Sequence, residues 1–306
     1  MNSLIRRLLG RDLASHTAGR VEQISTTLGT IEQLSHRSYQ LQRESFVRAL
    51  LQEPRYTDTR RLNLSEFRVF SQSGQDGIIE EIFRRVGNAG RVFVEFGVAA
   101  GGGFENNTTY LLAKGWSGHW IEADPAGCDR IERQMSAFIQ RGSLKLLRER
   151  VTVENIASLF ERLQVPEEFD LLSIDIDSHD YWVWHALRRY RPRLVVIEYN
   201  PFLPSSAHWV LPYDVHRSWD MDIEFGASLK AFEDLGRDLG YSLVGCDITG
   251  SDAFLVRNDL IGDQFCRPFT ADNHYEPMRY HLIQPWGYKR ELTATFGPVD
   301  SDRERG

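Results

Sequence analysis

The chain has 306 residues and a formal net charge of −7, and 42% of its residues are hydrophobic while 26% are charged. These proportions are typical of globular proteins, and the length suits one large domain with extensions. The acidic balance argues against a protein that binds nucleic acid over a broad surface, because such a surface must be basic to displace counterions.

The number of cysteines and the length of the apolar runs indicate where in the cell the protein is expected. Only three cysteines are present, far apart and with no C-x-x-C pair: Cys128, Cys246 and Cys266. We therefore expect neither a disulfide framework nor a structural zinc site, and a reducing, cytoplasmic location. No apolar run approaches the length of a membrane span, and arginines interrupt the first apolar residues, which argues against a signal peptide.

Residues 1–62 form a predicted helical extension. Apolar residues recur there at the helical spacing 3-4-3: Val21, Ile24, Leu28 and Ile31. Ser35 and Ser38 occupy the next two positions of this stripe, so a heptad pattern lasts about two repeats. The stripe fits an amphipathic helix that packs on the main domain or on a partner subunit, a short coiled coil that joins a homo-oligomer, or a basic helix on a membrane surface.

Strands and helices alternate from about residue 65. Strands are predicted at 91–98, 118–124, 143–151, 170–177 and 193–200, and helices at 74–87, 107–116, 129–140, 153–164, 180–190 and 227–240. Two last strands, 241–248 and 252–259, are separated by the short turn TGS and predict an antiparallel hairpin. The order predicts an α/β domain over 63–260, with a seven-stranded, mostly parallel sheet and helices on both faces. Residues 261–306 follow as a C-terminal extension.

A glycine-rich loop follows the first predicted strand, in VEFGVAAGGGFENNT. Gly97 comes directly after the strand, and Gly101, Gly102 and Gly103 follow. Glycines there allow a sharp turn and close approach of a ligand, which binds beyond the carboxyl ends of parallel strands. A tight turn without a ligand is the alternative. The dinucleotide pattern G-x-G-x-x-G is incomplete, because Asn106 stands where its third glycine belongs.

Glu122 ends the second predicted strand, in WIEAD. A carboxylate at this place can accept hydrogen bonds from both hydroxyls of a ribose. Enzymes that bind NAD place an acid at the same point, so Glu122 alone does not choose between nucleoside cofactors. A surface charge without a ligand is the alternative interpretation.

Three stretches together resemble the FkbM-type branch of class I S-adenosylmethionine-dependent methyltransferases: FSQSGQDGIIEEIF, FVEFGVAAGGGFENNTTYLLAKGWSGHWIEADP and LLSIDIDSHDYWVW. The resemblance covers about residues 67–258. The matching residues are Ser71, Gln72, Gly74, Asp76, Glu95, Gly97, Asn107, Thr108, Gly115, Trp116, Gly118, Glu122, Asp175, Asp177 and Asp180. The sequence departs from the family pattern where Gln75 replaces an acid, Glu95 an aspartate, and Ser178-His179 a glycine.

The resemblance implies the class I methyltransferase fold, which is Rossmann-like, and S-adenosylmethionine as the cofactor. The spacing from Gly97 to Gly101 resembles the loop that holds this cofactor. Carried over residue by residue, the expected cofactor-binding residues are Gln72, Asp76, Glu95, Gly97, Gly101, Asn107, Thr108, Glu122 and Asp175.

Acidic residues surround the end of the fourth predicted strand. Side chains alternate along a strand, so Asp175 and Asp177 point the same way, and Glu198 and Asn200 end the neighbouring fifth strand. These four oxygen-bearing side chains could hold Mg²⁺, as acids after these strands do in some class I O-methyltransferases that the chain resembles. Without a metal, Asp177 or His179 would accept the proton of the acceptor hydroxyl.

The candidate catalytic residues are thus Asp177, His179 and Asp180. A structural alternative leaves Asp175 as a helix cap or as a partner of the glycine loop.

The sequence predicts an S-adenosylmethionine-dependent O-methyltransferase that acts on the hydroxyl of a sugar, glycan or glycolipid, with or without Mg²⁺. Its expected partner is a small-molecule or glycan acceptor, with neither nucleic acid nor a transmembrane segment involved. One rival is an NAD(P)-dependent oxidoreductase, but the sequence lacks the third glycine of the dinucleotide pattern and a Tyr-x-x-x-Lys pair. The other is a non-catalytic oligomeric binding subunit that keeps the fold.

Overall fold

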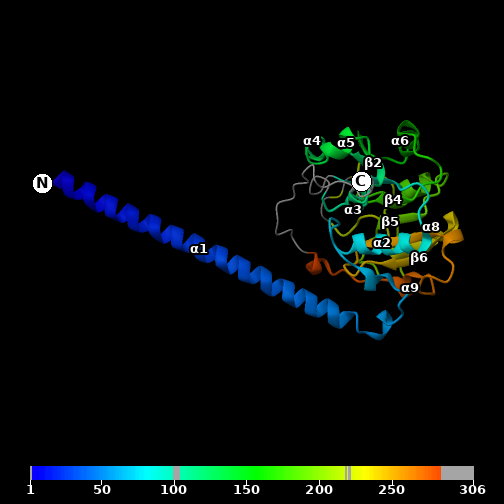
Figure 1. Ribbon diagram of the computed structural model, residues 1–306, viewed down its shortest axis with the longest axis horizontal. Coiled ribbons are helices and arrows are strands. Elements are labelled where there is room, and N and C mark those ends of the chain that lie inside the picture. Colours follow the sequence, from blue (N-terminus) through cyan, green and yellow to red (C-terminus); the bar gives the residue numbers. More distant parts are fainter. Residues whose placement is uncertain (1, 99–103, 218, 220–221, 284–306) are drawn as a thin grey trace, which may run out of the picture. The chain divides into compact units, whose positions relative to one another are not determined.

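The computed structural model describes residues 2–98, 104–217, 219 and 222–283, with side chains from residue 19 onward. The chain divides into two compact units, Met1–Thr57 and Asp58–Gly306 (Figure 1). Each unit is described by itself.

The first unit is mainly one long helix, α1 (Asn2–Leu50), followed by the short 3-10 helix η1 (Pro54–Tyr56). The predicted N-terminal helix is therefore confirmed. The side chains of its apolar stripe are 56–60% exposed: Val21, Ile24, Leu28 and Ile31. A homo-oligomer through this stripe stays a prediction.

The second unit is built on a seven-stranded sheet. Its strands are β1 (Val92–Phe96), β2 (Ser117–Glu122), β3 (Leu144–Arg148), β4 (Leu171–Ile174), β5 (Leu194–Glu198), β6 (Tyr241–Cys246) and β7 (Asp252–Arg257). They lie in the order β3-β2-β1-β4-β5-β7-β6. The first five strands are parallel, and β7 is antiparallel to both β5 and β6. The predicted fold is confirmed, and this strand order is that of the class I methyltransferase fold.

Helices cover both faces of the sheet, as predicted (Figure 1). On one face lie α2 (Gln75–Val86), α3 (Thr109–Ala113), α4 (Pro125–Gln134) and α5 (Ser136–Gln140). On the other face lie α6 (Ile156–Leu163), α7 (Asp180–Ala186) and α8 (Leu229–Leu239). Neighbouring strand residues such as Phe93 and Val94 belong to opposite cores, because successive side chains of a strand point to opposite faces.

The remaining short elements are η2 (Leu62–Ser65), η4 (Asn258–Leu260), α9 (Ala271–His274) and η5 (Tyr280–Leu282). The last two belong to the C-terminal extension. Phe265 of this extension lies in the core cluster beneath α2, and the Tyr199 hydroxyl donates to the Glu276 carbonyl oxygen at 2.5 Å. As far as it is described, the extension is therefore packed against the sheet.

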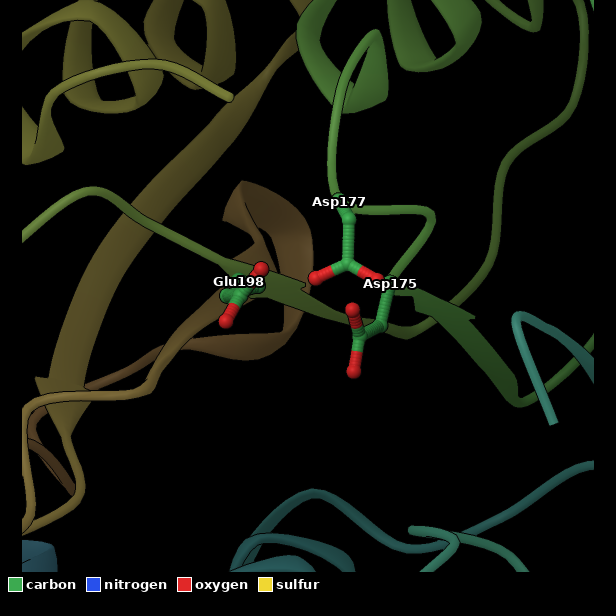
Figure 2. A group of neighbouring side chains, drawn as sticks. All are labelled: Asp175, Asp177 and Glu198. Atoms are coloured by element: carbon green, nitrogen blue, oxygen red, sulfur yellow. The ribbon is translucent and has the colours of Figure 1, made fainter. Parts of the chain in front are cut away.

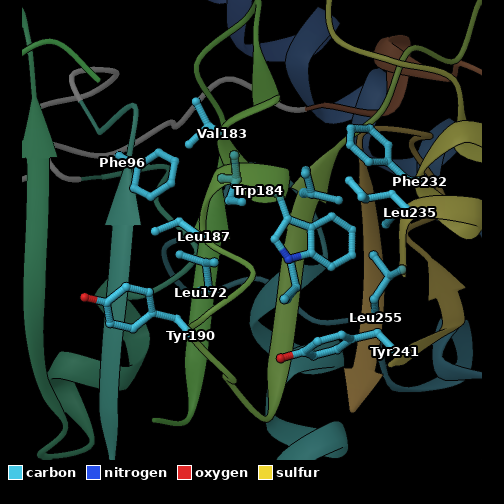
Figure 3. Close-up of a cluster of buried hydrophobic side chains, with 14 of the residues drawn as sticks. Phe96, Leu172, Val183, Trp184, Leu187, Tyr190, Phe232, Leu235, Tyr241 and Leu255 are labelled. Atoms are coloured by element: carbon cyan, nitrogen blue, oxygen red, sulfur yellow. The ribbon is translucent and has the colours of Figure 1, made fainter. Parts of the chain in front are cut away.

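Trp184 of α7 is central to the core on the second face (Figure 3). Its ring lies 6.4 Å from Phe232 of α8 and 5.8 Å from Tyr241 of β6. All three side chains are buried. Aromatic pairs at this separation stabilise packing beyond their buried area. This contact fixes α7, and with it the turn that joins β4 to α7.

Several element boundaries differ from the sequence prediction, those of β4 and α4 among them. β4 ends at Ile174 rather than 177, so Asp175 and Asp177 lie in the turn beyond the strand. The helix predicted at 129–140 is two helices, and the first begins at Pro125, because the Asp124 side chain accepts from the backbone N–H of Ala126 and Gly127. Such an N-cap satisfies otherwise unpaired donors and sets the start of a helix.

Among the described residues, no helix combines the length and apolar character that crossing a membrane requires. All three cysteines are buried, and within the part of the chain that the structure describes none of them forms a disulfide bond.

Candidate active site

A cavity of about 570 Å³ lies at the carboxyl ends of the parallel strands, and we call it the main cavity. Each of these strands contributes to its lining, with Gly97 after β1, Glu122 at the end of β2, Arg150 after β3, Asp175 after β4 and Glu198 at the end of β5. Ligands of open parallel sheets bind at this edge. The cavity is therefore the candidate active site.

Gly97 joins the end of β1 to the turn after β4. Its φ of +82° lies in the region that only glycine adopts freely, and a Cβ added there would lie 1.4 Å from the Asp175 carbonyl oxygen. The glycine predicted at the loop is thus required by a close approach of two backbones. Gly101, the second predicted glycine of this loop, lies outside the described residues.

The turn after β4 is held by Asp180, the first residue of α7. Its Oδ1 accepts from the Ile176 N–H at 2.8 Å and its Oδ2 from the Ser178 N–H at 3.1 Å. Both carboxylate oxygens are used by the backbone, and Asp180 is buried. We therefore interpret Asp180 as a residue that shapes the turn. Asp177 within the turn has a φ of +57°, which this hydrogen bonding helps to maintain.

Asp175, Asp177 and Glu198 form the acid cluster (Figure 2), in which one carboxylate oxygen of each residue lies within 4.8 Å of the others. Partial desolvation in the cavity raises the pKa of all three carboxyls, although the Asp177 side chain stays exposed to solvent. Repulsion by Asp177 raises the pKa of Asp175 further, and repulsion by Asp175 does so for Glu198. Three hard oxygen donors in this arrangement suit a divalent cation.

Asn200, the fourth predicted metal ligand, is placed differently. Its Nδ2 donates to the carbonyl oxygens of Ile223 at 2.8 Å and Phe225 at 3.1 Å, and its Oδ1 accepts from the Phe202 N–H at 3.1 Å. The side chain is fully buried, and the acid cluster does not include it. Asn200 holds the ends of the long loop after β5 together.

Glu95 organises the start of α3. Its carboxylate accepts from the N–H groups of Asn107 at 2.8 Å and Thr108 at 3.2 Å, and from the Thr108 hydroxyl. The Asn107 Nδ2 donates in turn to Ser173 of β4. Burial raises the pKa of Glu95 to about 7. These predicted cofactor-binding residues thus come together through their own hydrogen bonds. Glu95 and Asn107 also border a small cavity of about 50 Å³ that shares Gly97 with the main cavity.

Gln72 and Asp76, the two predicted cofactor-binding residues before β1, are placed differently. Gln72 lines both cavities. The Asp76 Oδ2 instead accepts from the N–H groups of Val69, Phe70 and Ser71 at 2.7–2.9 Å. Asp76 thus fixes the backbone that carries Gln72 to the cavity.

Glu122 lines the main cavity, and only part of the hydrogen-bonding capacity of its carboxylate is used. Its Oε1 accepts from the Asp124 N–H at 2.6 Å, whereas its buried Oε2 has no hydrogen-bond partner among the described residues. Leaving a buried polar atom unpaired costs about 1–3 kcal/mol. A ligand hydroxyl that donates to Oε2 would remove this cost, so Glu122 fits the predicted ribose-binding role.

The sequence analysis missed several residues that line the main cavity. They are Arg150, Arg217, Tyr280 and Ile283. Tyr280 belongs to the C-terminal extension, and its pKa is raised by burial and then by the nearby Glu198. No local pattern in the sequence indicates these residues, because loops from distant parts of the chain bring them to the sheet.

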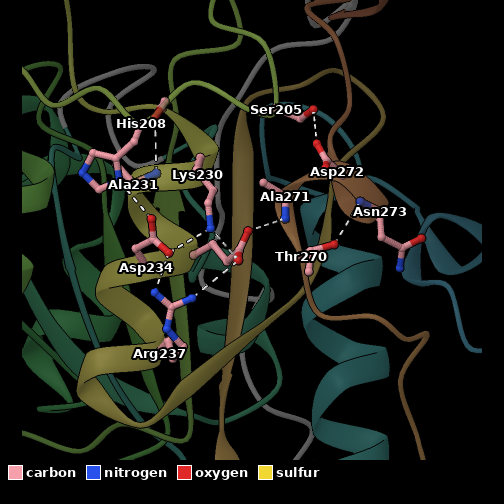
Figure 4. A network of polar contacts seen from close by, with 12 residues as sticks. Ser205, His208, Lys230, Ala231, Asp234, Arg237, Thr270, Ala271, Asp272 and Asn273 are labelled. Atoms are coloured by element: carbon pink, nitrogen blue, oxygen red, sulfur yellow. Dashed lines mark hydrogen bonds and ion pairs between the residues drawn. The ribbon is translucent and has the colours of Figure 1, made fainter.

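The long loop after β5 is also held by contacts outside the main cavity (Figure 4). His208 Nδ1 lies 2.9 Å from the Asp234 carboxylate of α8, and the Ser205 hydroxyl donates to Asp272 at 2.6 Å. The same Asp234 accepts from Lys230 and Arg237. These contacts engage His208 and hold the loop to α8 and α9.

A pH dependence follows from the buried carboxyls. Burial raises the pKa of Glu95 and Asp252 to about 7 and that of Asp180 to about 6, whereas in an unfolded chain such groups titrate near about 4. At pH values between the unfolded and the folded pKa values, the folded state binds more protons than the unfolded chain. Its free energy of unfolding therefore falls as the pH rises through this window. We expect a lower thermal midpoint at pH 8 than at pH 5 in ligand-free protein, by differential scanning calorimetry.

The matched variant for this experiment is Asp252→Asn. It should show a smaller drop between pH 5 and pH 8, because one of the titrating carboxyls is gone. A midpoint that rises over this range in the unmodified protein would contradict the pKa directions.

The sequence matches no family model and no curated protein. Comparison with solved structures finds a candidate O-methyltransferase from Klebsiella pneumoniae, 15% identical over 73% of this chain and 99% of that one, with a TM-score of 0.41. A candidate caffeoyl-CoA O-methyltransferase from Staphylococcus aureus is 13% identical over 60% and 82%, with a TM-score of 0.40. An O-methyltransferase from Bacillus cereus is 16% identical over 53% and 66%, with a TM-score of 0.31. These likenesses are weak, and the fold assignment depends on the strand order itself.

Proposed function

We propose that the protein is an S-adenosylmethionine-dependent O-methyltransferase. One observation carries the proposal: the main cavity combines a glycine turn and an unpaired ribose acid at one part of the sheet edge with the acid cluster at the other. Between them a nucleoside cofactor and an acceptor hydroxyl could lie side by side. S-adenosylmethionine would supply an electrophilic methyl group on its sulfonium.

Each side of the cavity has its own role in this proposal. Gly97 lets the backbone approach the cofactor, and Glu122 accepts a ribose hydroxyl through its unpaired Oε2. Asp177 accepts the proton of the acceptor hydroxyl. Because methyl transfer requires an in-line approach, much of the rate enhancement would come from holding the two reactants in place.

We further propose that the acid cluster binds Mg²⁺ or a similar hard cation through Asp175, Asp177 and Glu198, without Asn200. The mutual repulsion of these carboxylates and their all-oxygen donor set support this assignment. Bound there, the cation would offset the repulsion and lower the pKa of a neighbouring hydroxyl.

The acceptor we propose is a polyhydroxylated molecule, such as a sugar, a glycan or a glycolipid head group. A sugar presents several adjacent hydroxyls, and the carboxylates of the acid cluster and the Gln72 amide offer it several hydrogen-bond partners in one cavity. The catalytic domain would span about 63–260, with Tyr280 of the extension added to its site.

The test is isothermal titration calorimetry with S-adenosylhomocysteine, the product that a methyltransferase of this kind releases. We expect micromolar binding by the unmodified protein. The variant Glu122→Ala should bind about 10-fold more weakly or worse, since a hydrogen bond to a charged group contributes about 1.5–3 kcal/mol. Glu132→Ala, an exposed acid on α4, is the matched control and should bind normally.

No binding of S-adenosylhomocysteine by folded protein would refute the proposal. NADH would then be titrated in its place, since Glu122 also suits the ribose of a nicotinamide cofactor. Binding of neither would favour the non-catalytic subunit.

A further inference from the structure

His179 is held in one tautomer by the loop that covers it. Its Nε2 lies 2.6 Å from the Asp214 carbonyl oxygen, and a carbonyl can only accept, so Nε2 carries the proton. The ring also stacks edge-on against Tyr213, with 4.8 Å between centroids. In the neutral ring, Nδ1 is therefore a hydrogen-bond acceptor with a lone pair.

That acceptor is buried and unpaired. Nδ1 has no hydrogen-bond partner among the described residues, and the His179 side chain is 6% exposed. Within the lining of the main cavity, the only other buried side-chain atom without a partner among the described residues is Glu122 Oε2. Both atoms are acceptors, so two residues of the cavity lining lack a donor that a ligand could supply.

The surroundings of His179 in the main cavity favour recognition of a ligand. Arg150 follows β3, and its guanidinium donates to the Arg217 carbonyl oxygen at 3.0 Å. Both arginines line the main cavity together with His179. Because the Asp214 carbonyl oxygen engages Nε2, Nδ1 is the ring atom that is left to accept a hydrogen bond from a ligand.

Apolar side chains also line the main cavity. Ile121 and Ala123 flank Glu122 in the chain, and Val151 follows Arg150. Such walls suit a flat ring, and the face of a ring can also lie against a guanidinium. A ligand with ribose hydroxyls for Glu122 and a ring that bears an amino group would match both unpaired acceptors.

We propose that His179 reads the 6-amino group of the cofactor's adenine through Nδ1 and so sets the base specificity of the site. The proposal rests on the proposed function and gives His179 a recognition role in place of the catalytic one predicted from the sequence. A 6-amino group donates to Nδ1, whereas the 6-oxo group of hypoxanthine would place a second acceptor against it.

The experiment compares S-adenosylhomocysteine by titration calorimetry with S-inosylhomocysteine, which has a 6-oxo group in place of the 6-amino group and a proton on N1. We expect the unmodified protein to prefer the adenine compound by about 10- to 100-fold, the effect of one unmade hydrogen bond to a buried acceptor. In His179→Gln the amide can still reach the Asp214 carbonyl, but no acceptor remains at the Nδ1 position. This variant should bind the adenine compound about 10-fold more weakly and lose most of the preference.

His185→Gln is the matched control, because His185 is exposed on the same helix, α7, and should leave both affinities unchanged. A second readout is the ¹⁵N resonance of Nδ1, identified by its loss in His179→Gln. It should move toward lower frequency when S-adenosylhomocysteine binds, as a nitrogen lone pair does on accepting a hydrogen bond.

The outcomes separate this inference from the proposed function. Equal binding of both compounds by the unmodified protein, or full preference retained in His179→Gln, would overturn the role of His179 and leave the methyltransferase proposal standing. Binding of neither compound by folded protein would overturn the proposed function and this inference with it.

Discussion

Replacing Gly97 by alanine is expected to destabilise the second unit by about 2–5 kcal/mol or to prevent its folding. A residue with a Cβ at a φ of +82° costs about 1–2 kcal/mol. The new Cβ would also lie 1.4 Å from the Asp175 carbonyl oxygen, and overpacking costs about 1–3 kcal/mol more. Because the obstacle is backbone, no side-chain rotation can relieve it, and β1 must separate from the turn after β4.

Urea unfolding followed by circular dichroism measures this effect. Gly142→Ala is the matched control: its φ is +77°, but no atom lies within 4 Å of an added Cβ. The free energy of unfolding of the control should therefore fall only by the cost of a positive φ, about 1–2 kcal/mol. Equal destabilisation by the two variants would show that the approach of Gly97 to Asp175 is unimportant.

Replacing Asp177 by asparagine is expected to abolish cation binding at the acid cluster. The substitution keeps the size of the side chain and removes one of three carboxylate ligands. Loss of even an outer partner of a metal ligand weakens binding about 10- to 100-fold, and loss of a ligand should weaken it at least as much. Electron paramagnetic resonance of added Mn²⁺ would detect the change, and Glu198→Gln should behave in the same way.

Two controls make this result specific. Asp238→Asn removes an exposed acid of α8 and should leave Mn²⁺ affinity unchanged. Asn200→Ala tests the assignment of Asn200 to the loop: it should lower the thermal midpoint while the remaining folded protein binds Mn²⁺ normally. Unchanged Mn²⁺ affinity in both Asp177→Asn and Glu198→Gln would remove the metal from the proposed mechanism, leaving Asp177 as a metal-free base.

Hydrogen bonding explains why residues matched by one motif occupy different roles. Asp175, Asp177 and Asp180 are separated by at most five positions, yet Asp180 turns both oxygens toward backbone N–H groups while the other two reach the acid cluster. Asp76 and Gln72 diverge for the same reason. A motif names residue types and spacing, whereas the direction of each side chain depends on which donors its own turn leaves unpaired.

The sequence by itself determined the order of strands and helices, the place of the glycine turn and the acids at the strand ends. Those features follow from local periodicity, which sets the face of each side chain, and from turn residues that end each element. Only the tertiary structure decided that Glu198 joins Asp175 and Asp177, that Asn200 holds a loop, and that Tyr280 reaches the same cavity. It also decided that Glu122 and His179 each keep one acceptor atom that no described residue pairs with. These outcomes depend on contacts between residues that are far apart in the sequence, because the conformation of the loops that close the cavity is set by packing against the rest of the domain.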